Sequence, residues 1–249
     1  MTGVLAGRAL WVRQRLWQMT LALERGHLPS CYSIVDLLVA LYYGPYFRHD
    51  PKDPKNPNRD RLIISKGHAS MAIYPILADR GYFPLGELDC YGQPGGLLGM
   101  FANPKIPGIE TVSDSLGHGL GIGAGMAYAG ALDNLAYKTF VILGDAECNE
   151  GSVWEAAAFA SHYRLAHLTA FVDMNNLGIL GEPIMLGDLA ARWQAFGWVV
   201  LRRDGHDFKD LIETLESIRQ ADEIGRPTVV LIDTIKGKGL SFIEGKTEW

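Results

Sequence analysis

The sequence predicts an α/β protein with a doubly wound, mostly parallel sheet and helices on both faces. Residues 139–143 and 168–172 are strand-like segments of apolar and β-branched residues, and helix formers occupy residues 152–163 between them. This order is that of a βαβ unit, whose strands run parallel and whose connection is right-handed. The chain has 249 residues, 48% of them hydrophobic, which suffices for one large core. We therefore expect a single domain over residues 1–249.

The N-terminal part of the chain predicts two helices with a loop between them. Helical periodicity extends over residues 4–25, with apolar positions at Leu5, Ala9, Leu16, Met19 and Leu23. Gly26 ends this helix, and His27 lies in the loop that follows. The second helix is expected to begin at Ser33, with Asp36 three residues on completing an approximate capping box.

A polar segment at residues 50–60 is expected to be a surface loop, because the strand-like residues 61–65 follow it at once. The sequence then continues into a helix that is expected to reach residue 80. The segment between that strand and that helix is Ser65-Lys66-Gly67-His68-Ala69-Ser70. A junction of this kind offers backbone N–H groups to an anion.

The middle of the chain combines a long loop with a run of glycines. Residues 84–115 are rich in proline and glycine, and so long a loop in a compact domain is usually functional. Gly119 and Gly121 superficially match a dinucleotide-binding fingerprint, but that fingerprint requires a preceding strand, and residues 110–115 form a poor one. We instead expect residues 117–125 to lie on a helix that packs closely or approaches a ligand.

The C-terminal part predicts two further strands, at residues 198–201 and 228–234, with a helix from Asp207 as N-cap to about residue 220. His206 and Asp207 are adjacent in a turn and make a poor metal chelate, so no metal is assigned to them. The segment Lys236-Gly237-Lys238-Gly239 lacks the surrounding residues of a phosphate-binding loop.

Composition excludes several classes of protein. The net charge of −5 and the lack of a basic block argue against a nucleic-acid partner. No apolar run approaches eighteen residues, so neither a signal peptide nor a membrane span is expected. Cys31, Cys90 and Cys148 have no metal-binding spacing and are interpreted as free thiols of a cytoplasmic protein.

Oxygen-bearing side chains follow both strands of the βαβ unit. Asp145 comes just after the first strand and Asn175 just after the second. Ligands of such sheets bind outside the carboxyl ends of the strands. Carboxylate and amide oxygens suit Mg²⁺ or Ca²⁺, and Mg²⁺ takes further ligands from phosphates. These residues therefore predict a Mg²⁺–diphosphate site; the alternative is that both are ordinary loop residues.

Several residues of this region resemble the thiamine diphosphate motif of the transketolase family: Gly144-Asp145-Ala146, Glu150-Gly151, Trp154-Glu155-Ala156, Asp173 and Asn175. The resemblance implies thiamine diphosphate and Mg²⁺ (or Ca²⁺) as cofactors, on the diphosphate-binding domain of the family. It implies that Asp145, Asn175 and the backbone carbonyl of Leu177 hold the metal. Ala146 replaces a family glycine that permits positive φ, so some backbone strain is expected there.

The same resemblance implies a wider set of cofactor-binding residues, namely His68, Leu116, Gly117, Gly144, Asp145, Ala146, Glu150, Glu155, Asn175, Leu177 and Ile179. Glu150 and Glu155 are expected in an acidic network at a subunit interface. His68 matches the family's Ser-x-Gly-His-Ala motif, and His27 loosely matches its Gly-His-Pro loop, since Leu28 intervenes. Both histidines are implied to be catalytic, His27 in proton transfer beside the substrate; the alternatives are a structural His27 and a helix-capping His68.

Two departures from the family bear on the substrate. Asn103 stands where the family has a histidine that contacts the donor sugar, and Asn carries no proton at neutral pH. Asp114 stands where the family usually has glycine. A donor other than the usual sugar phosphate is therefore left open, with Asn103 as a substrate residue.

The resemblance extends from about residue 13 to the end of the chain and matches only the diphosphate-binding domain. It implies the N-terminal subunit of a split transketolase, with pyrimidine-binding and C-terminal domains on a partner chain in an α2β2 assembly. This enzyme would transfer a two-carbon ketol unit from a ketose or ketose phosphate to an aldose. The alternatives are a subunit of a 2-oxo acid dehydrogenase or a deoxyxylulose-phosphate-synthase-like enzyme, or a non-catalytic regulatory paralogue. The segment Gly67-His68-Ala69-Ser70 favours transketolase, and Asp145 and Asn175 argue against a non-catalytic chain.

Overall fold

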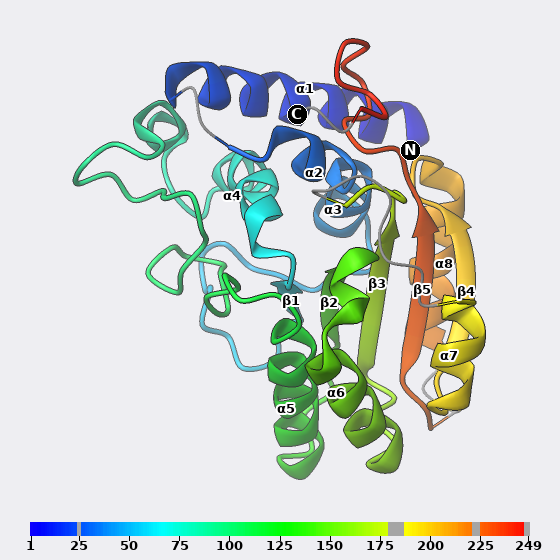
Figure 1. Ribbon diagram of the computed structural model, residues 1–249. Helices are drawn as coiled ribbons and strands as arrows, with labels where there is room; N and C mark the ends of the chain where they lie inside the picture. Colours follow the sequence, from blue (N-terminus) through cyan, green and yellow to red (C-terminus); the bar gives the residue numbers. More distant parts are fainter. Residues whose placement is uncertain (24–25, 179–186, 221–224, 247–249) are drawn as a thin grey trace.

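The computed structural model describes residues 1–249 apart from 24–25, 179–186, 221–224 and 247–249. Its centre is a five-stranded sheet in the order β1-β2-β3-β5-β4, and every neighbouring pair is parallel (Figure 1). The strands are β1 Arg61–Ile64, β2 Thr139–Gly144, β3 Leu168–Met174, β4 Val199–Asp204 and β5 Thr228–Asp233. The predicted parallel α/β architecture is confirmed.

Helices cover both faces of the sheet and enclose two hydrophobic cores. One face carries α1 Thr2–Leu23, α2 Leu28–Tyr32, α3 Val35–Tyr43, α4 Tyr74–Arg80 and α8 Phe208–Gln220. The other face carries α5 Gly119–Leu132, α6 Gly151–His162 and α7 Leu189–Ala195. Alternate residues of β2 belong to different cores: Phe140 and Ile142 lie in the first, and Val141 and Leu143 lie in the second. This is the period-two pattern of a strand buried on both faces.

Three short 3₁₀ helices complete the described elements: η1 Gly67–Ile73, η2 Leu85–Cys90 and η3 Ala146–Asn149. In the part of the chain described here, no helix is both long and apolar enough to cross a membrane. Cys31, Cys90 and Cys148 are free thiols, as the sequence predicts.

Local structure departs from the sequence prediction in three places. The helix expected from Ser33 begins at Val35 as α3, and a further short helix, α2, occupies the loop expected before it. Asp36 does not cap a helix and instead pairs with Arg13. The helix expected to reach Arg80 begins as η1 and becomes α4 only at Tyr74. Helix α7 was not predicted.

The register of β2 and β3 brings the ends of these strands together. Gly144 pairs with Asp173, and the Asp145 N–H donates to the Asp173 carbonyl oxygen at 3.2 Å. Helix α5 packs closely behind them, since a Cβ on Gly123 would lie 2.4 Å from Cγ2 of Val141. The expected close approach of a glycine-rich helix is thus confirmed at Gly123.

Candidate functional site at the carboxyl ends of the strands

A cavity of about 410 Å³ opens at the carboxyl ends of β2 and β3. It lies where ligands bind in parallel α/β sheets. Nine residues singled out from the sequence line it: His27, His68, Asp114, Leu116, Gly144, Asp145, Ala146, Asn175 and Leu177. The fold thus brings together segments that lie far apart in the chain.

Asp145 and the loop after β3 are joined by a direct contact. The Asn176 N–H donates to Asp145 Oδ2 at 2.6 Å, and the Ala146 N–H donates to Asp145 Oδ1 at 2.7 Å. Burial raises the pKa of the Asp145 carboxyl, and these two N–H groups oppose the rise. Asn176 has a left-handed φ of 58°, so the chain turns sharply at the residue whose N–H contacts Asp145.

The orientation of the Asn175 amide is set by hydrogen bonds on both of its atoms. Its Nδ2 donates to Asp173 Oδ2 at 2.8 Å, and its Oδ1 accepts from the Leu177 N–H at 3.1 Å. The amide oxygen therefore faces the loop that carries the Leu177 carbonyl. An amide held in this sense presents oxygen rather than nitrogen on the side that a cation would approach.

Behind Asn175 lies a fully buried ion pair between Lys66 and Asp173. Asp173 also accepts hydrogen bonds from Ser33 Oγ at 2.7 Å and from Thr234 Oγ1. Burial by itself would raise the pKa of Asp173, but the Lys66 ammonium and the hydroxyl donors hold it below its ordinary value. The carboxylate is thus ionised and connects α2, η1, β3 and β5 beneath the cavity floor.

His27 and His68 lie beside one another at the cavity, with their rings packed edge to face and the ring centroids 5.5 Å apart. His27 is at the N-terminus of α2 and His68 is in η1. Burial, followed by the charge of Lys66, lowers the pKa of His68 to about 3. At neutral pH His68 is therefore a neutral imidazole that donates one hydrogen bond and accepts one.

Two lysines that the sequence analysis did not select also line the cavity, Lys66 and Lys236. The Lys236 side chain follows β5, is largely buried, and donates from Nζ to the Leu177 carbonyl oxygen at 3.3 Å. Burial and the charge of Lys66 lower the pKa of Lys236. A phosphate group in the cavity would therefore meet cationic groups from two different strand ends.

Glu147 is a third cavity residue that sequence patterns did not identify. Its buried carboxylate accepts from the N–H groups of Gly117 and Gly144, at 2.8 and 2.9 Å, and from Ser65 Oγ. Burial raises its pKa, and these donors counteract the rise. Glu147 thus ties the end of β2 to the segments that carry His68 and Leu116.

The remaining predicted residues lie elsewhere. Gly117 is buried and reaches the site only through its hydrogen bond to Glu147. Glu150 and Glu155 are exposed and are not part of the cavity lining. Asn103 does not line the cavity either; its Oδ1 accepts from the Lys105 N–H at 3.0 Å and closes a local turn. Ile179 lies outside the described residues.

The strain expected at Ala146 is absent. Within the described residues, left-handed φ angles of non-glycine residues occur at Asn134, Arg164 and Asn176. Ala146 instead opens η3, with the Asp145 side chain accepting its N–H. Alanine at position 146, where the family has glycine, therefore causes no backbone strain in this chain.

The donor set at the cavity rim fits Mg²⁺ and a diphosphate. Asp145, Asn175 and Leu177 offer a carboxylate, an amide oxygen and a carbonyl oxygen, which are hard ligands. No group of three or more His, Cys, Asp or Glu side chains suited to a metal occurs in the described residues. A metal here would therefore depend on amide, carbonyl and phosphate oxygens in addition to one carboxylate, as Mg²⁺ sites commonly do.

Comparison with known proteins gives consistent results. Residues 15–248 match the sequence family described as transketolase, thiamine diphosphate binding domain. A 6-deoxy-6-sulfo-D-fructose transketolase subunit from Clostridium sp. (strain MSTE9) is 42% identical over 225 residues, covering 89% of this chain and 81% of that protein. One of the apulose-4-phosphate transketolase subunits, from Phocaeicola vulgatus, is 38% identical over 240 residues, covering 95% and 84% respectively.

Solved structures show the same fold. The transketolase of Campylobacter jejuni superposes with a TM-score of 0.92 at 28% identity, covering 100% of this chain and 40% of that one. The chain therefore spans less than half the length of this single-chain relative. The similarity covers the whole of the sheet and both helical layers described above.

Proposed function

Because this chain belongs to the transketolase family, we propose that it is the diphosphate-binding subunit of a two-component transketolase. A partner polypeptide would supply the pyrimidine-binding and C-terminal domains, with two copies of each chain in the assembly. The coverage of the relatives supports this proposal, since the chain spans 81% and 84% of two transketolase subunits but 40% of a single-chain transketolase. These relatives favour transketolase over the other thiamine diphosphate enzymes considered above.

The observation that carries the proposal is the contact between Asp145 and the loop that begins at Asn175. The Asn176 N–H donates to the Asp145 carboxylate at 2.6 Å, so the loop after β3 is held against the end of β2. We assign Mg²⁺ to Asp145, Asn175 and the Leu177 carbonyl, and the diphosphate to the metal. Lys236 would neutralise part of the diphosphate charge, because its ammonium already lies on the Leu177 carbonyl.

When bound, thiamine diphosphate supplies an electron sink for breaking and forming carbon–carbon bonds. We assign different roles towards the substrate to His27 and His68. His68, with a pKa of about 3, resists taking up a proton and is suited to orienting a substrate hydroxyl by hydrogen bonding. Proton transfer is assigned to His27, whose ring packs edge to face against that of His68 and lines the same cavity.

The donor is proposed to be a ketose that carries an anionic group. The two subunit relatives are named for a sulfo-deoxyfructose and for a phosphorylated apulose, so both sulfonate and phosphate belong in the donor screen. Asp114 and Phe101 line the cavity and Asn103 does not. We therefore expect the replacement Asp114→Gly to change donor preference more than Asn103→His. The free thiols support our proposal of a cytoplasmic enzyme.

The first test is calorimetric titration of thiamine diphosphate with Mg²⁺ into this chain alone and into its mixture with the candidate partner subunit. We expect tight binding only in the mixture. Asp145→Ala should abolish the Mg²⁺-dependent part of binding, because it removes the single carboxylate of the metal site. Unchanged affinity in Asp145→Ala would overturn the assignment of the site.

A further inference from the structure

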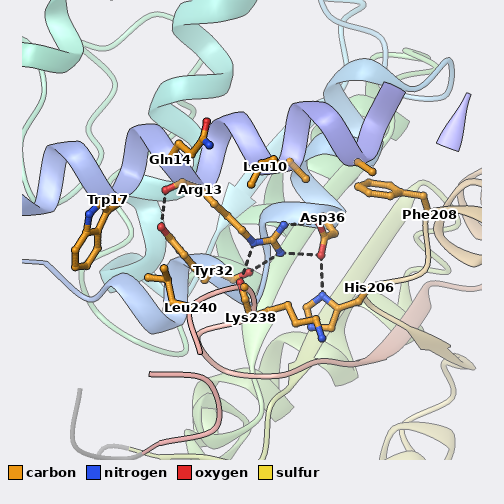
Figure 2. Close-up of a pocket in the computed structure, with 13 residues that line it drawn as sticks. Leu10, Arg13, Gln14, Trp17, Tyr32, Asp36, His206, Phe208, Lys238 and Leu240 are labelled. Atoms are coloured by element: carbon orange, nitrogen blue, oxygen red, sulfur yellow. Dashed lines mark hydrogen bonds and ion pairs between the residues drawn. The ribbon is translucent and has the colours of Figure 1, made fainter. Parts of the chain in front are cut away.

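A second cavity, of about 420 Å³, lies between α1 and the turn at residues 235–240, and it shares no lining residue with the cofactor cavity. Its polar floor consists of Arg13, Asp36 and His206, here called the Asp36 cluster (Figure 2). The three residues come from α1, from α3 and from the turn between β4 and α8. Their side chains are only 13%, 7% and 12% exposed, so the cluster is an internal feature of the fold.

Asp36 holds the other two members through charged hydrogen bonds. Arg13 donates from Nη1 and Nη2 to the two carboxylate oxygens at 2.9 and 2.8 Å. His206 Nδ1 lies 2.7 Å from Asp36 Oδ2, and its Nε2 accepts the Ile235 N–H at 2.9 Å. Because a backbone N–H only donates, Nε2 is unprotonated and the ring proton is on Nδ1, directed at Asp36. Asp36 therefore fixes both the position and the tautomer of His206.

The Asp36 cluster forms hydrogen bonds with the turn at residues 235–240 at two points. His206 accepts the N–H of Ile235, and Arg13 Nε donates to the Lys238 carbonyl oxygen at 2.9 Å. The turn fits closely against Arg13, since a Cβ on Gly239 would lie 3.1 Å from Arg13 Cδ, and Gly239 has a φ of +99°. Only glycine combines that backbone conformation with so close an approach at no cost.

Lys236 lies between these two points, and its side chain leaves the turn on the opposite side, towards the cofactor cavity. Its Nζ donates to the Leu177 carbonyl oxygen at 3.3 Å. The next N–H, that of Gly237, donates to the Pro29 carbonyl oxygen at 3.0 Å, and Pro29 also lines the cofactor cavity. The turn is thus held by the Asp36 cluster on one side and presents a cation to the cofactor on the other.

We propose that Arg13, Asp36 and His206 are positioning residues that set the affinity for Mg²⁺–thiamine diphosphate by fixing Lys236, although none of them lines the cofactor cavity. This inference rests on the proposed function. In this proposal the Asp36 cluster affects cofactor binding only through the position of the Lys236 side chain. A purely structural role would instead lower stability without acting through Lys236.

The test is a double-mutant cycle on cofactor affinity, measured by calorimetry in the mixture with the partner subunit. Lys236→Met is expected to weaken binding by about tenfold or more, the range for a hydrogen bond to a charged group. His206→Ala is expected to weaken it by about tenfold, because the turn loses one anchor. In the Lys236→Met background, His206→Ala should change affinity by less than about twofold.

Two further variants act on the same turn in different ways. Gly239→Ala displaces the turn from Arg13 and should weaken binding like His206→Ala, which provides a second route if one variant does not fold. His206→Gln can accept from Ile235 and donate to Asp36, so it should recover most of the affinity. Equal effects of His206→Ala in the two Lys236 backgrounds, or no effect in either, would overturn the proposal.

His49 provides a matched control. It is partly buried, and its ring nitrogens contact the Tyr42 carbonyl oxygen at 3.1 Å and Tyr82 Oη at 3.2 Å, away from both cavities. His49→Ala should lower the melting temperature and leave cofactor affinity within about twofold of the wild-type value. If the wild-type mixture itself does not bind thiamine diphosphate, the proposed function fails first, and the inference fails with it.

Discussion

At the scale of single residues, Asp173 is the carboxylate on which the cofactor cavity depends most. It is fully buried and accepts from Lys66, Ser33, Thr234 and Asn175. Its replacement by an uncharged amide leaves the Lys66 ammonium buried without a charged partner. Such a loss is more costly than the absence of the whole pair, because the desolvated charge remains.

We therefore expect Asp173→Asn to lower the free energy of unfolding by about 3–5 kcal/mol. Adding Lys66→Met to this variant should restore part of the loss, since the unpaired charge is then removed. Urea unfolding of the two single variants and the double variant measures both effects. Strictly additive losses would show that the pair is not coupled in the folded protein.

The pKa of His68 implies a dependence of stability on pH. Its folded value of about 3 lies below the ordinary value of 6.5, so the unfolded chain takes up a proton at higher pH than the folded protein. The stability that His68 contributes is full above pH 6.5 and is lost progressively as the pH falls towards 3. Between pH 7.5 and pH 5 this loss amounts to about 2 kcal/mol at most.

In His68→Gln that contribution is absent, so the variant should lose about 1–2 kcal/mol less than the wild type over the same pH interval. Urea unfolding of both proteins without cofactor at pH 7.5 and pH 5 tests this difference. Other titrating groups affect both proteins equally and cancel in the comparison. Identical losses would mean that the folded protein protonates His68 as readily as the unfolded chain does.

The sequence identified some residues of the site and not others, for a physical reason. Asp145 and Asn175 follow strands of one βαβ unit, and the geometry of that unit alone brings them to the same sheet edge. Lys236 and Glu147 reach the cavity only because the turn after β5 and the helix η3 fold back on it. Such placements depend on tertiary packing, which no local pattern encodes. Asn103 does not line the cavity for the same reason, since its place depends on how a long loop folds.

At the scale of elements, the five strands were predictable because each contains a run of apolar and β-branched residues. Helix α7 was not, since its seven residues are too few to show a helical period. One local signal was present: Asp188 accepts the Ala191 N–H at 3.2 Å and caps the helix. The packing of Trp193 against Trp154 and Trp198, with ring centroids 5.0 and 4.9 Å away, then holds α7 in place.

This packing predicts the consequences of changing Trp193, which is fully buried. Trp193→Ala should lower the free energy of unfolding by about 3–5 kcal/mol, as large-to-small core changes do. Trp193→Phe should cost much less, because the indole N–H has no hydrogen-bond partner among the described residues and its removal relieves an unsatisfied donor. Thermal unfolding monitored by circular dichroism compares the two, and similar losses would contradict this account.

At the scale of the whole molecule, an exposed aromatic cluster on α5 and α6 marks the surface where we expect the partner to bind. Tyr128, Phe159 and Tyr163 pack together, with ring centroids 4.6–5.6 Å apart, yet Phe159 and Tyr163 are 38% and 45% exposed. Glu155 lies one helical turn before Phe159 on α6, on the same side. Glu155, one of the two acidic residues predicted at a subunit interface, therefore shares a surface with the aromatic cluster.

Phe159→Asp should weaken association with the partner subunit by at least about tenfold, as charged replacements of a buried interface aromatic do, and should leave the fold intact. Analytical ultracentrifugation of the mixture measures association. Leu85, which is also exposed but lies in η2, provides the control, since Leu85→Asp should not affect assembly. Equal association of all three proteins would exclude this surface as the interface.

The two edge strands of the sheet, β4 and β1, are both poor partners for a foreign strand. Strand β4 leaves one edge open and carries Arg202 and Arg203 on it, with Arg202 paired to Asp233 of β5. Strand β1, at the other edge, has only four residues. Short strands and charged side chains discourage a foreign strand from adding to an open edge. In a two-component enzyme of the kind proposed here, such edges would protect a subunit from the misdirected strand pairing that begins amyloid-like aggregation, and the subunit could accumulate before its partner chain has been made.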